Sequence, residues 1–205
     1  MRCLLSGSVV MLLFGCASAY KNLQPASADV SRLLAFKPAY TVALYKAKID
    51  VLDNYLSGLL LIKRMPDSSL RLVFSNEIGV QFFDFEFSSE GVFKVHSAIK
   101  QLDRKAVITT LRKDFELVLM EGINPARVTT QTRDGLIFYS FPQAKGYYRY
   151  VTNRAGDTLV RMERSTKRTP VMQAIMQEYT NGVPDSIGIT HHRFKFNIGL
   201  KILPR

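Results

Sequence analysis

Two neighbouring histidines, His191 and His192, are the first candidates for chemistry, because imidazole nitrogens ligate metals and carry protons near neutral pH. Adjacent residues on a strand point to opposite faces, so these two side chains cannot easily hold one metal ion. No cysteine and no H-E-x-x-H spacing stands near them. We therefore interpret the pair as one exposed and one half-buried histidine at a strand end, and we predict neither a metal site nor a cofactor.

A pair of carboxylates, Asp84 and Glu86, has the residue types of a general acid and a general base. Both alternate with Phe83, Phe85 and Phe87, so strand geometry places the carboxylates on the solvent side of an amphipathic strand. The chain contains no G-x-S-x-G, P-loop or glycine-rich dinucleotide motif. The sequence predicts a protein that is not an enzyme.

Cys16 is the residue whose surroundings point to a specific modification. It ends the segment Leu13-Phe14-Gly15-Cys16, which closes an apolar run of about a dozen residues, the length of a signal-peptide core. The segment resembles a bacterial lipobox: small Gly15 lets a peptidase reach the scissile bond, and the exposed thiol accepts a diacylglycerol. Phe14 is bulkier than the usual residue at its position. This interpretation makes residues 1–15 a lipoprotein signal peptide and Cys16 the lipidation site, with palmitate as a typical acyl chain.

A second cleavage site is also compatible with the sequence. Ala17-Ser18-Ala19 has the A-x-A form of an ordinary secretory cleavage site, and cleavage there would release a protein without cysteine. The apolar run is too short for a permanent membrane helix, which needs about twenty residues. Both alternatives predict export, and neither requires a disulfide, because Cys3 leaves with the signal peptide.

The formal net charge of +11 is spread along the 205 residues rather than gathered in a run of lysines and arginines. The chain also lacks the aromatic signature of the common RNA-binding domains. We therefore expect no nucleic-acid partner. A basic surface of this kind is suited to the anionic face of a membrane.

The chain after Cys16 divides into a tether and one domain. Residues 16–38 form the lipidated N-terminus and tether, in which the stretch 31–36 docks on the domain or forms a short helix. Residues 39–205 are predicted to be β-rich. A period of two from Ala43 to Val51 predicts a strand, and the apolar segment from Tyr55 to Met65 predicts a strand buried on both faces.

A single amphipathic helix interrupts the strands at residues 103–119, with Asp103 as the N-cap and Gly122 as the stop signal. Seven further strands follow, ending in the regular alternation between Phe194 and Ile202. About eleven antiparallel strands are too many for a flat sheet. We therefore predict a mainly β (α+β) fold, a strongly curved antiparallel sheet or unclosed barrel covered by one main helix.

The most apolar strands and the facing helix supply the candidate residues for an acyl-chain groove. The same residue types build ordinary cores, so sequence alone leaves both interpretations open. A slip of one residue would also invert the inward face, because Leu59 and Leu61 are as apolar as their neighbours. The candidate groove residues are Leu60, Ile62, Leu72, Phe74, Phe83, Phe85, Leu111 and Phe115.

The lipobox, the tether, the two runs of strands and the single helix together resemble the lipoprotein-localisation fold of the periplasmic carrier and its outer-membrane receptor. The segments 56–63 and 82–87 are also similar to uncharacterised Bacteroidetes lipoproteins of this shape. The resemblance covers most of residues 40–203, and no single motif in it is diagnostic. It implies an unclosed barrel with an apolar cavity for acyl chains, in a protein of the outer membrane that faces the periplasm.

Two functions follow as expectations. The first is a lipid-anchored, non-enzymatic envelope protein that binds lipid or lipoprotein acyl chains in an apolar groove, with the membrane as partner through its N-terminal anchor. The second is a structural or interaction lipoprotein, a tethered subunit of an envelope assembly with a solid core. An open apolar pocket would favour the first, and a fully packed core would favour the second.

Overall fold

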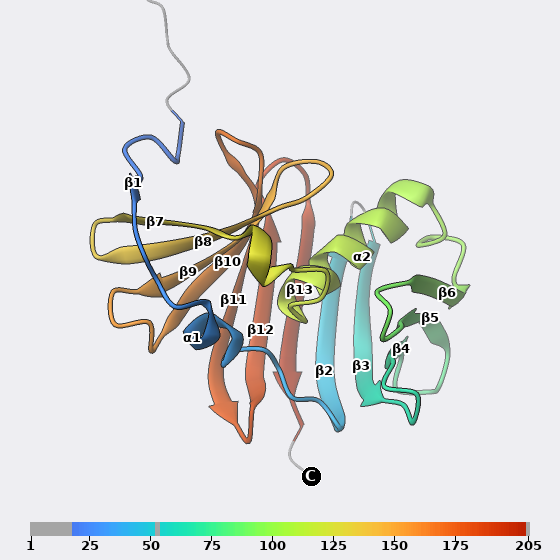
Figure 1. The fold of residues 1–205 in the computed structure, drawn as a ribbon. Coiled ribbons are helices and arrows are strands. Elements are labelled where there is room, and N and C mark those ends of the chain that lie inside the picture. The colour runs from blue at the N-terminus through green and yellow to red at the C-terminus, as the bar shows by residue number, and fades with distance from the viewer. Residues whose placement is uncertain (1–17, 52–53, 204–205) are drawn as a thin grey trace, which may run out of the picture.

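A computed structural model describes residues 18–51 and 54–203, which form one antiparallel sheet with two α-helices and one 3-10 turn (Figure 1). Within these ranges the sheet has thirteen strands, in the order β1-β7-β8-β9-β10-β11-β12-β13-β2-β3-β4-β5-β6. The strands are β1 (Gln24–Pro25), β2 (Val42–Val51), β3 (Asn54–Arg64), β4 (Leu70–Ser75), β5 (Gln81–Phe87), β6 (Phe93–Ala98), β7 (Thr129–Arg133), β8 (Leu136–Pro142), β9 (Tyr147–Asn153), β10 (Leu159–Ser165), β11 (Pro170–Thr180), β12 (Val183–His191) and β13 (Phe196–Ile202). The helices are α1 (Val30–Leu34), α2 (Lys105–Val118) and a 3-10 turn at Pro125–Arg127.

The sheet consists of two meanders, β2–β6 and β7–β13, that meet where β13 pairs with β2. Its two ends curl toward the same side, and α2 crosses the concave face between them (Figure 1). The curved, open sheet with one main helix confirms the predicted fold class. One strand that the sequence did not predict is β1, whose two residues lie in the segment predicted as a tether and pair with β7.

Alternation decides which side chains fill the concave face. In β2, Ala43, Tyr45, Ala47, Ile49 and Val51 are all at most 3 % exposed, while the residues between them reach the outer face. Each inward row continues across the sheet, because the strands pair in register. The core is therefore a single apolar layer between the sheet and α2.

The strand β3 differs from the prediction of a strand buried on both faces. Leu60 and Ile62 are buried on the concave side, whereas Leu59 and Leu61 are half-buried on the outer side and Tyr55 is 61 % exposed. The prediction was wrong because an antiparallel sheet of this kind is covered on one face only, so an apolar outer row can remain partly open to solvent.

The helix α2 covers the concave face with the residues that the four-four-three spacing indicates. Val107, Leu111, Phe115 and Val118 are all buried. The predicted N-cap at Asp103 is wrong, because Arg104 occupies that position and makes no side-chain capping hydrogen bond. The helix is therefore held mainly by its packing and not by a strong cap.

The N-terminal segment from residue 18 is attached to both faces of the sheet. On the outer face the Tyr20 hydroxyl donates a hydrogen bond of 2.6 Å to Glu163, and the Arg149 guanidinium lies 3.8 Å from the Tyr20 ring centre. After β1, the Asp29 carboxylate accepts a hydrogen bond from the Ser31 amide and starts α1. Leu33 of α1 is completely buried in the core.

Part of the predicted tether is thus folded onto the domain. The predicted signal peptide at 1–15 and the predicted lipidation site Cys16 lie outside the described residues. In the described ranges, no helix is long and apolar enough to cross a membrane.

Candidate functional site: the concave face beneath α2

The eight candidate groove residues come together on the concave face. Leu60, Phe74 and Phe83 form one row across β3, β4 and β5. A parallel row joins Ile62, Leu72 and Phe85 through the same strand pairs. Leu111 and Phe115 cover these rows from α2. The inward direction assigned from sequence is therefore the one that the structure has, and the outward residues are Leu59 and Leu61.

These residues are buried and belong to one hydrophobic core. All eight are at most 1 % exposed. The Phe83 and Phe85 rings stack with centres 4.3 Å apart, and the Phe83 and Phe115 rings meet edge to face at 6.1 Å. The candidate groove is therefore closed in this structure, with side chains filling the space that an acyl chain would need.

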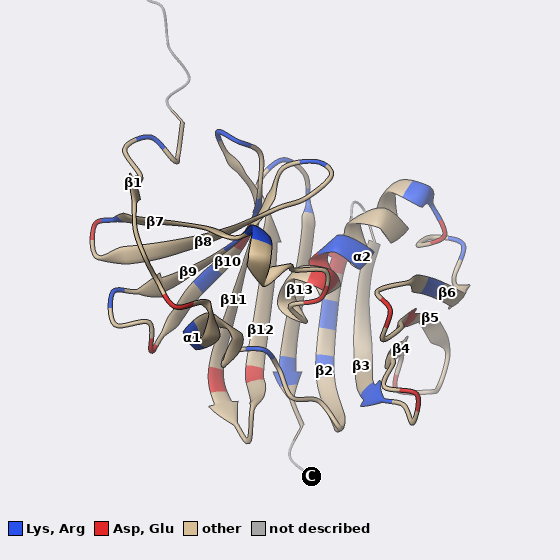
Figure 2. Cartoon of the chain, viewed as in Figure 1, with Lys and Arg blue, Asp and Glu red and all other residues tan. Residues whose placement is uncertain are grey.

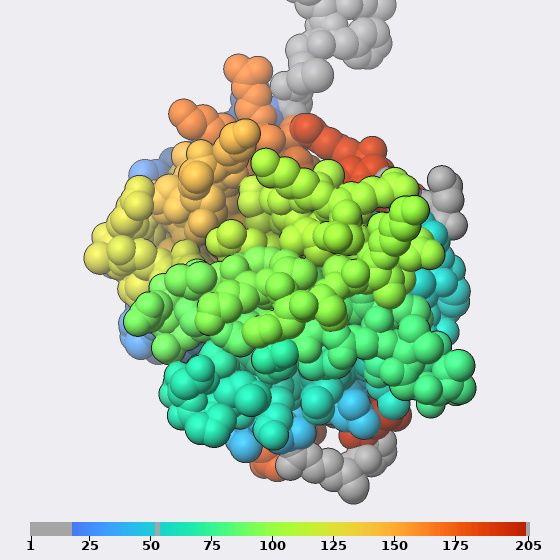
Figure 3. Space-filling model, turned by 90° about the vertical axis from the view of Figure 1, so that its right-hand side faces the viewer, coloured from blue at the N-terminus to red at the C-terminus, as the bar shows by residue number. Residues whose placement is uncertain are grey.

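Polar contacts from β9 also hold α2 in place. The Tyr148 hydroxyl donates a hydrogen bond of 2.8 Å to Glu116, and the Tyr150 hydroxyl donates one of 3.0 Å to the Leu117 carbonyl. Burial raises the pKa of both tyrosines well above their ordinary value, so both hydroxyls remain protonated donors at neutral pH. On the side formed by β4–β6 and α2, the surface of the molecule is continuous (Figure 3).

A buried charged cluster joins the inner face of α2 to β10 and β12. Asp114 Oδ2 lies 2.8 Å from His191 Nε2, and Asp114 Oδ1 lies 3.4 Å from Arg164 Nε. The side chains of Asp114 and His191 are completely buried, and that of Arg164 is 13 % exposed. Within the described residues, Asp114 Oδ1, Arg164 Nε and His191 Nδ1 have no hydrogen-bond partner.

We call these three residues the Asp114 cluster. The cluster attaches α2 to the sheet, but burying its charged groups costs free energy. Buried charges that are incompletely hydrogen-bonded lose their hydration without full compensation. The sequence contained a signal for it, because Asp114 stands three residues after Leu111 on the apolar stripe of the helix. The prediction of a half-buried histidine therefore needs correction: His191 is buried against α2, and His192 is exposed.

The carboxylates Asp84 and Glu86 lie on the outer face of β5, the side predicted for them, but ion pairs shield them from solvent. Arg71 Nη2 donates a hydrogen bond of 2.8 Å to Asp84. Lys94 Nζ and His96 Nε2 lie 3.0 and 2.8 Å from the two oxygens of Glu86. The Lys94 ammonium, followed by His96, lowers the pKa of Glu86. The carboxylates therefore belong to a cross-strand ion network.

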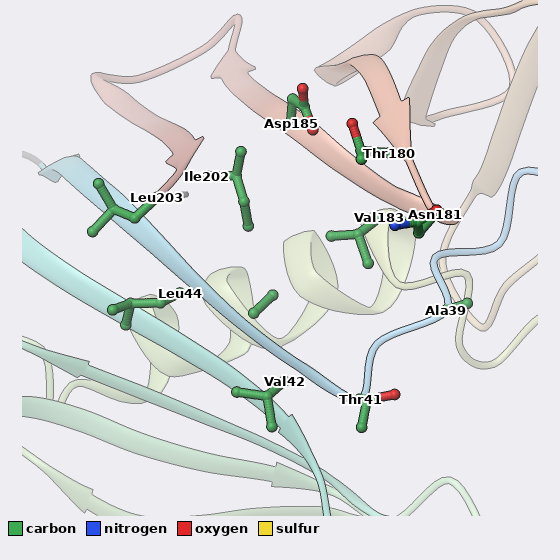
Figure 4. A pocket seen from close by; sticks show the side chains of 11 residues that line it. Ala39, Thr41, Val42, Leu44, Thr180, Asn181, Val183, Asp185, Ile202 and Leu203 are labelled. Atoms are coloured by element: carbon green, nitrogen blue, oxygen red, sulfur yellow. The ribbon is translucent and has the colours of Figure 1, made fainter. Parts of the chain in front are cut away.

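The pocket shown in Figure 4 lies elsewhere, at the end of β13. Because β13 ends at Ile202, the neighbouring strands β2 and β12 flank a slot of about 520 Å³. Val42 and Leu44 line it on one side, and Val183 and Asp185 line it on the other (Figure 4). None of the eight candidate groove residues lines this slot. Among the residues that the structure describes, no group of three metal-ligating side chains is present.

Comparison with known proteins gives likenesses in structure alone. No family model matches the chain, and no curated protein matches it. A domain from Vibrio parahaemolyticus ascribed to outer membrane lipoprotein sorting has 9 % identity and a TM-score of 0.44, covering 85 % of this chain and 88 % of that one. A DUF1329 family protein from Desulfovibrio piger has 10 % identity and a TM-score of 0.42, with the same two coverages. At such low identities and TM-scores, these structural likenesses say nothing about the function of this chain.

Proposed function

We propose that this chain is a lipid-anchored, non-enzymatic protein of the bacterial envelope that takes up an acyl chain of a lipid or lipoprotein beneath α2. One observation carries the proposal. The apolar concave face of the sheet is covered mainly by α2, and the inner face of that helix carries the incompletely satisfied Asp114 cluster. A cover with this composition costs less to displace than an all-apolar one, because the charged groups regain water when the helix moves.

Displacement of α2 would expose the two rows of Leu, Ile and Phe side chains as a trough between the curled ends of the sheet. An acyl chain bound there would replace the buried contacts of Leu111 and Phe115. Each buried methylene group contributes about 0.8 kcal/mol, so a long chain can offset the cost of moving a helix. An anchor at Cys16 would keep the trough near the outer membrane, facing the periplasm.

Photo-crosslinking tests the proposal directly. The protein is titrated with a long-chain fatty acid that carries a diazirine and a fluorophore, and the crosslinked peptides are identified by mass spectrometry. We expect saturable binding that survives high salt, with crosslinks at inward residues such as Leu60 and Phe83. The melting temperature should rise, because a ligand at a hundredfold excess over its Kd stabilises the folded state by about 2.7 kcal/mol. Crosslinks confined to the outward Leu59 and Leu61, with none at inward residues, would contradict the proposed site.

The second candidate is a structural or interaction lipoprotein with a solid core. The observation in its favour is that all eight candidate groove residues are at most 1 % exposed. In that case the titration would show neither salt-resistant binding nor a change in melting temperature. The basic outer surface would then attract lipid headgroups only, and this binding would disappear at high salt.

A further inference from the structure

The outer face of the sheet contains a hollow whose floor consists of two glycines. Gly188 of β12 and Gly199 of β13 are direct partners across the strand pair. A Cβ atom added to either glycine would meet nothing within 4 Å, and the register of this strand pair has no shift. Neither crowding nor a bulge therefore requires these glycines. Glycine in a regular strand is unfavourable, and it often marks a place where a ligand approaches the backbone.

Polar and positively charged side chains of β2, β11, β12 and β13 surround this floor, forming a hollow of about 540 Å³. Lys48 continues the row of the two glycines, and Ile175 closes the other end of that row. The adjacent row joins Gln177, Ser186, Lys201 and Lys46 in register. Lysines therefore occupy one end of the hollow, and ligand-sized space lies above the glycine floor. We refer to this feature as the lysine hollow.

The arrangement of the lysines is unfavourable in the absence of an anion. Lys46 and Lys201 are directly opposite each other on paired strands, where like charges destabilise a sheet. Lys48 stands two residues from Lys46 and points to the same face. Within the described ranges, Lys46 and Lys48 have no carboxylate within 4.0 Å, and Lys201 has only the exposed Glu178 at 3.8 Å. An exposed pair of this length contributes little.

The surroundings of the lysine hollow match a lipid surface better than a small soluble anion. Half-buried Leu59 is the cross-strand partner of Lys46, and partly exposed Leu44 is the partner of Leu61. The outer face of β2 and β3 is thus an apolar strip beside positive charges, and Figure 2 shows Lys and Arg along β2, β13 and the end of β3. Basic and aliphatic side chains on one face are typical of proteins that lie on anionic membranes.

We infer that the lysine hollow binds the phosphate-bearing headgroup of an anionic phospholipid and so lays the outer face of the sheet on the membrane. The inference rests on the proposed attachment of the chain to a membrane, but not on acyl-chain uptake beneath α2. The headgroup phosphate would lie among Lys46, Lys48 and Lys201 over the glycine floor. The opposite, α2-covered face would then point away from the bilayer toward incoming ligands.

Site-specific quenching in vesicles tests this orientation. The acylated protein has no other thiol once residues 1–15 are removed and Cys16 is modified, so Ser57→Cys takes a single fluorophore. Ser57 is exposed and is the cross-strand partner of Lys48. Vesicles contain a lipid with a nitroxide on its headgroup, in phosphatidylcholine with or without phosphatidylglycerol. A label at exposed Thr109→Cys on α2 reports the opposite face.

We expect phosphatidylglycerol to increase quenching of the Ser57 label and to leave the Thr109 label unchanged. Each lysine near an anionic surface strengthens the association about fivefold, so Lys46→Gln, Lys48→Gln and Lys201→Gln together should weaken it on the order of a hundredfold. A matched variant with Lys105, Lys145 and Lys167 changed to Gln should retain the quenching, because these exposed lysines lie outside the lysine hollow.

Two further experiments distinguish headgroup binding in the lysine hollow from non-specific attraction between the basic surface and anionic lipid. Gly199→Val fills the lysine hollow with all lysines kept, and its melting temperature shows whether the sheet is intact. We expect phosphatidylglycerol to increase quenching of the Ser57 label less in Gly199→Val than in the protein with Gly199. If folded Gly199→Val shows the same quenching of the Ser57 label as the protein with Gly199, headgroup binding in the lysine hollow is refuted. Equal quenching with and without phosphatidylglycerol would refute it as well. Inorganic phosphate that abolishes the response at constant ionic strength would assign the hollow to a soluble anion instead of a lipid. Absence of the protein from floated vesicles would refute the membrane attachment itself.

Discussion

Individual buried charges decide how firmly α2 is held. Asp114 faces His191 and Arg164, so removal of its carboxylate leaves a histidine and an arginine buried without their partner. We expect Asp114→Ala to lower the free energy of unfolding by about 3–5 kcal/mol, the usual cost of breaking a buried ion pair. Thermal and urea denaturation measure this. A melting curve that matches the wild type would show that the cluster contributes nothing to attachment of the helix.

Substitutions at the same three positions also test whether the Asp114 cluster makes displacement of α2 easier. Replacing Asp114 and His191 with Leu and Arg164 with Met removes the ionisable groups of the Asp114 cluster, and such replacements are often neutral or stabilising. We expect this triple variant to be at least as stable as the wild type and to take up fatty acid more weakly, since its cover gains no hydration on opening. If a stable triple variant takes up fatty acid as well as the wild type, the Asp114 cluster does not contribute to ligand uptake.

Glu86 gives the outer ion network a dependence on pH. The pKa of Glu86 is lowered in the folded protein, first by Lys94 and then by His96. The network therefore stabilises the fold above the ordinary glutamate pKa of about 4.3, and this contribution is lost as the pH falls through the lower folded value. We expect Glu86→Gln to be less stable than the wild type at pH 7, with the difference in melting temperature shrinking in acid. A constant difference from pH 7 to pH 3 would contradict this.

At the scale of elements, α2 is the part on which the whole concave face depends. Leu111→Asp would place an unpaired charge against the Phe-rich strands, which we expect to cost several kcal/mol and to prevent accumulation of folded protein. Thr109→Asp is the matched control, because Thr109 is on the same helix but exposed. Equal thermal melts of the two variants would show that the helix is not packed as described.

The elements that the sequence predicts well are those with a strict period. The alternation of β2 and the four-four-three spacing of α2 identify both element and buried face, because burial against one layer imposes that period. The strand β1 could not be predicted, since two residues show no period and their partner strand β7 lies more than a hundred residues later in the chain. The predicted N-cap at Asp103 was wrong because the helix begins one residue later, with Arg104 at the N-cap position.

The site was harder to predict than the fold. The sequence left open which face of each strand points inward, and the structure places the eight candidate residues on the inward face. Local sequence also does not encode whether side chains fill the trough that they form. The partners of Asp114 lie on strands more than forty residues away, so only the folded chain brings them together. The lysine hollow likewise depends on strand register, which places Lys201 opposite Lys46.

At the scale of the whole molecule, the proposed function makes attachment to the membrane depend on Cys16. We expect Cys16→Ala to abolish palmitate labelling and to move the protein from the membrane fraction to the soluble fraction, because two or more acyl chains are what makes such anchoring stable. Metabolic labelling and fractionation of cells measure both effects. Unchanged membrane association in the variant would count against the lipid anchor, and cleavage after Ala19 in the wild type would establish the secretory alternative.

The pairing of β13 with β2 has a consequence for the time course of folding. The centre of the sheet joins residues 42–51 to residues 196–202, which are separated by almost the whole domain. Sheets with such non-local pairs fold slowly, since the loop must close before the contacts repay its entropy. During synthesis from the N-terminus, the edge of β2 that pairs with β13 would therefore stay unpaired until residues 196–202 are available. We expect β2 to be the strand at which premature association with other chains begins.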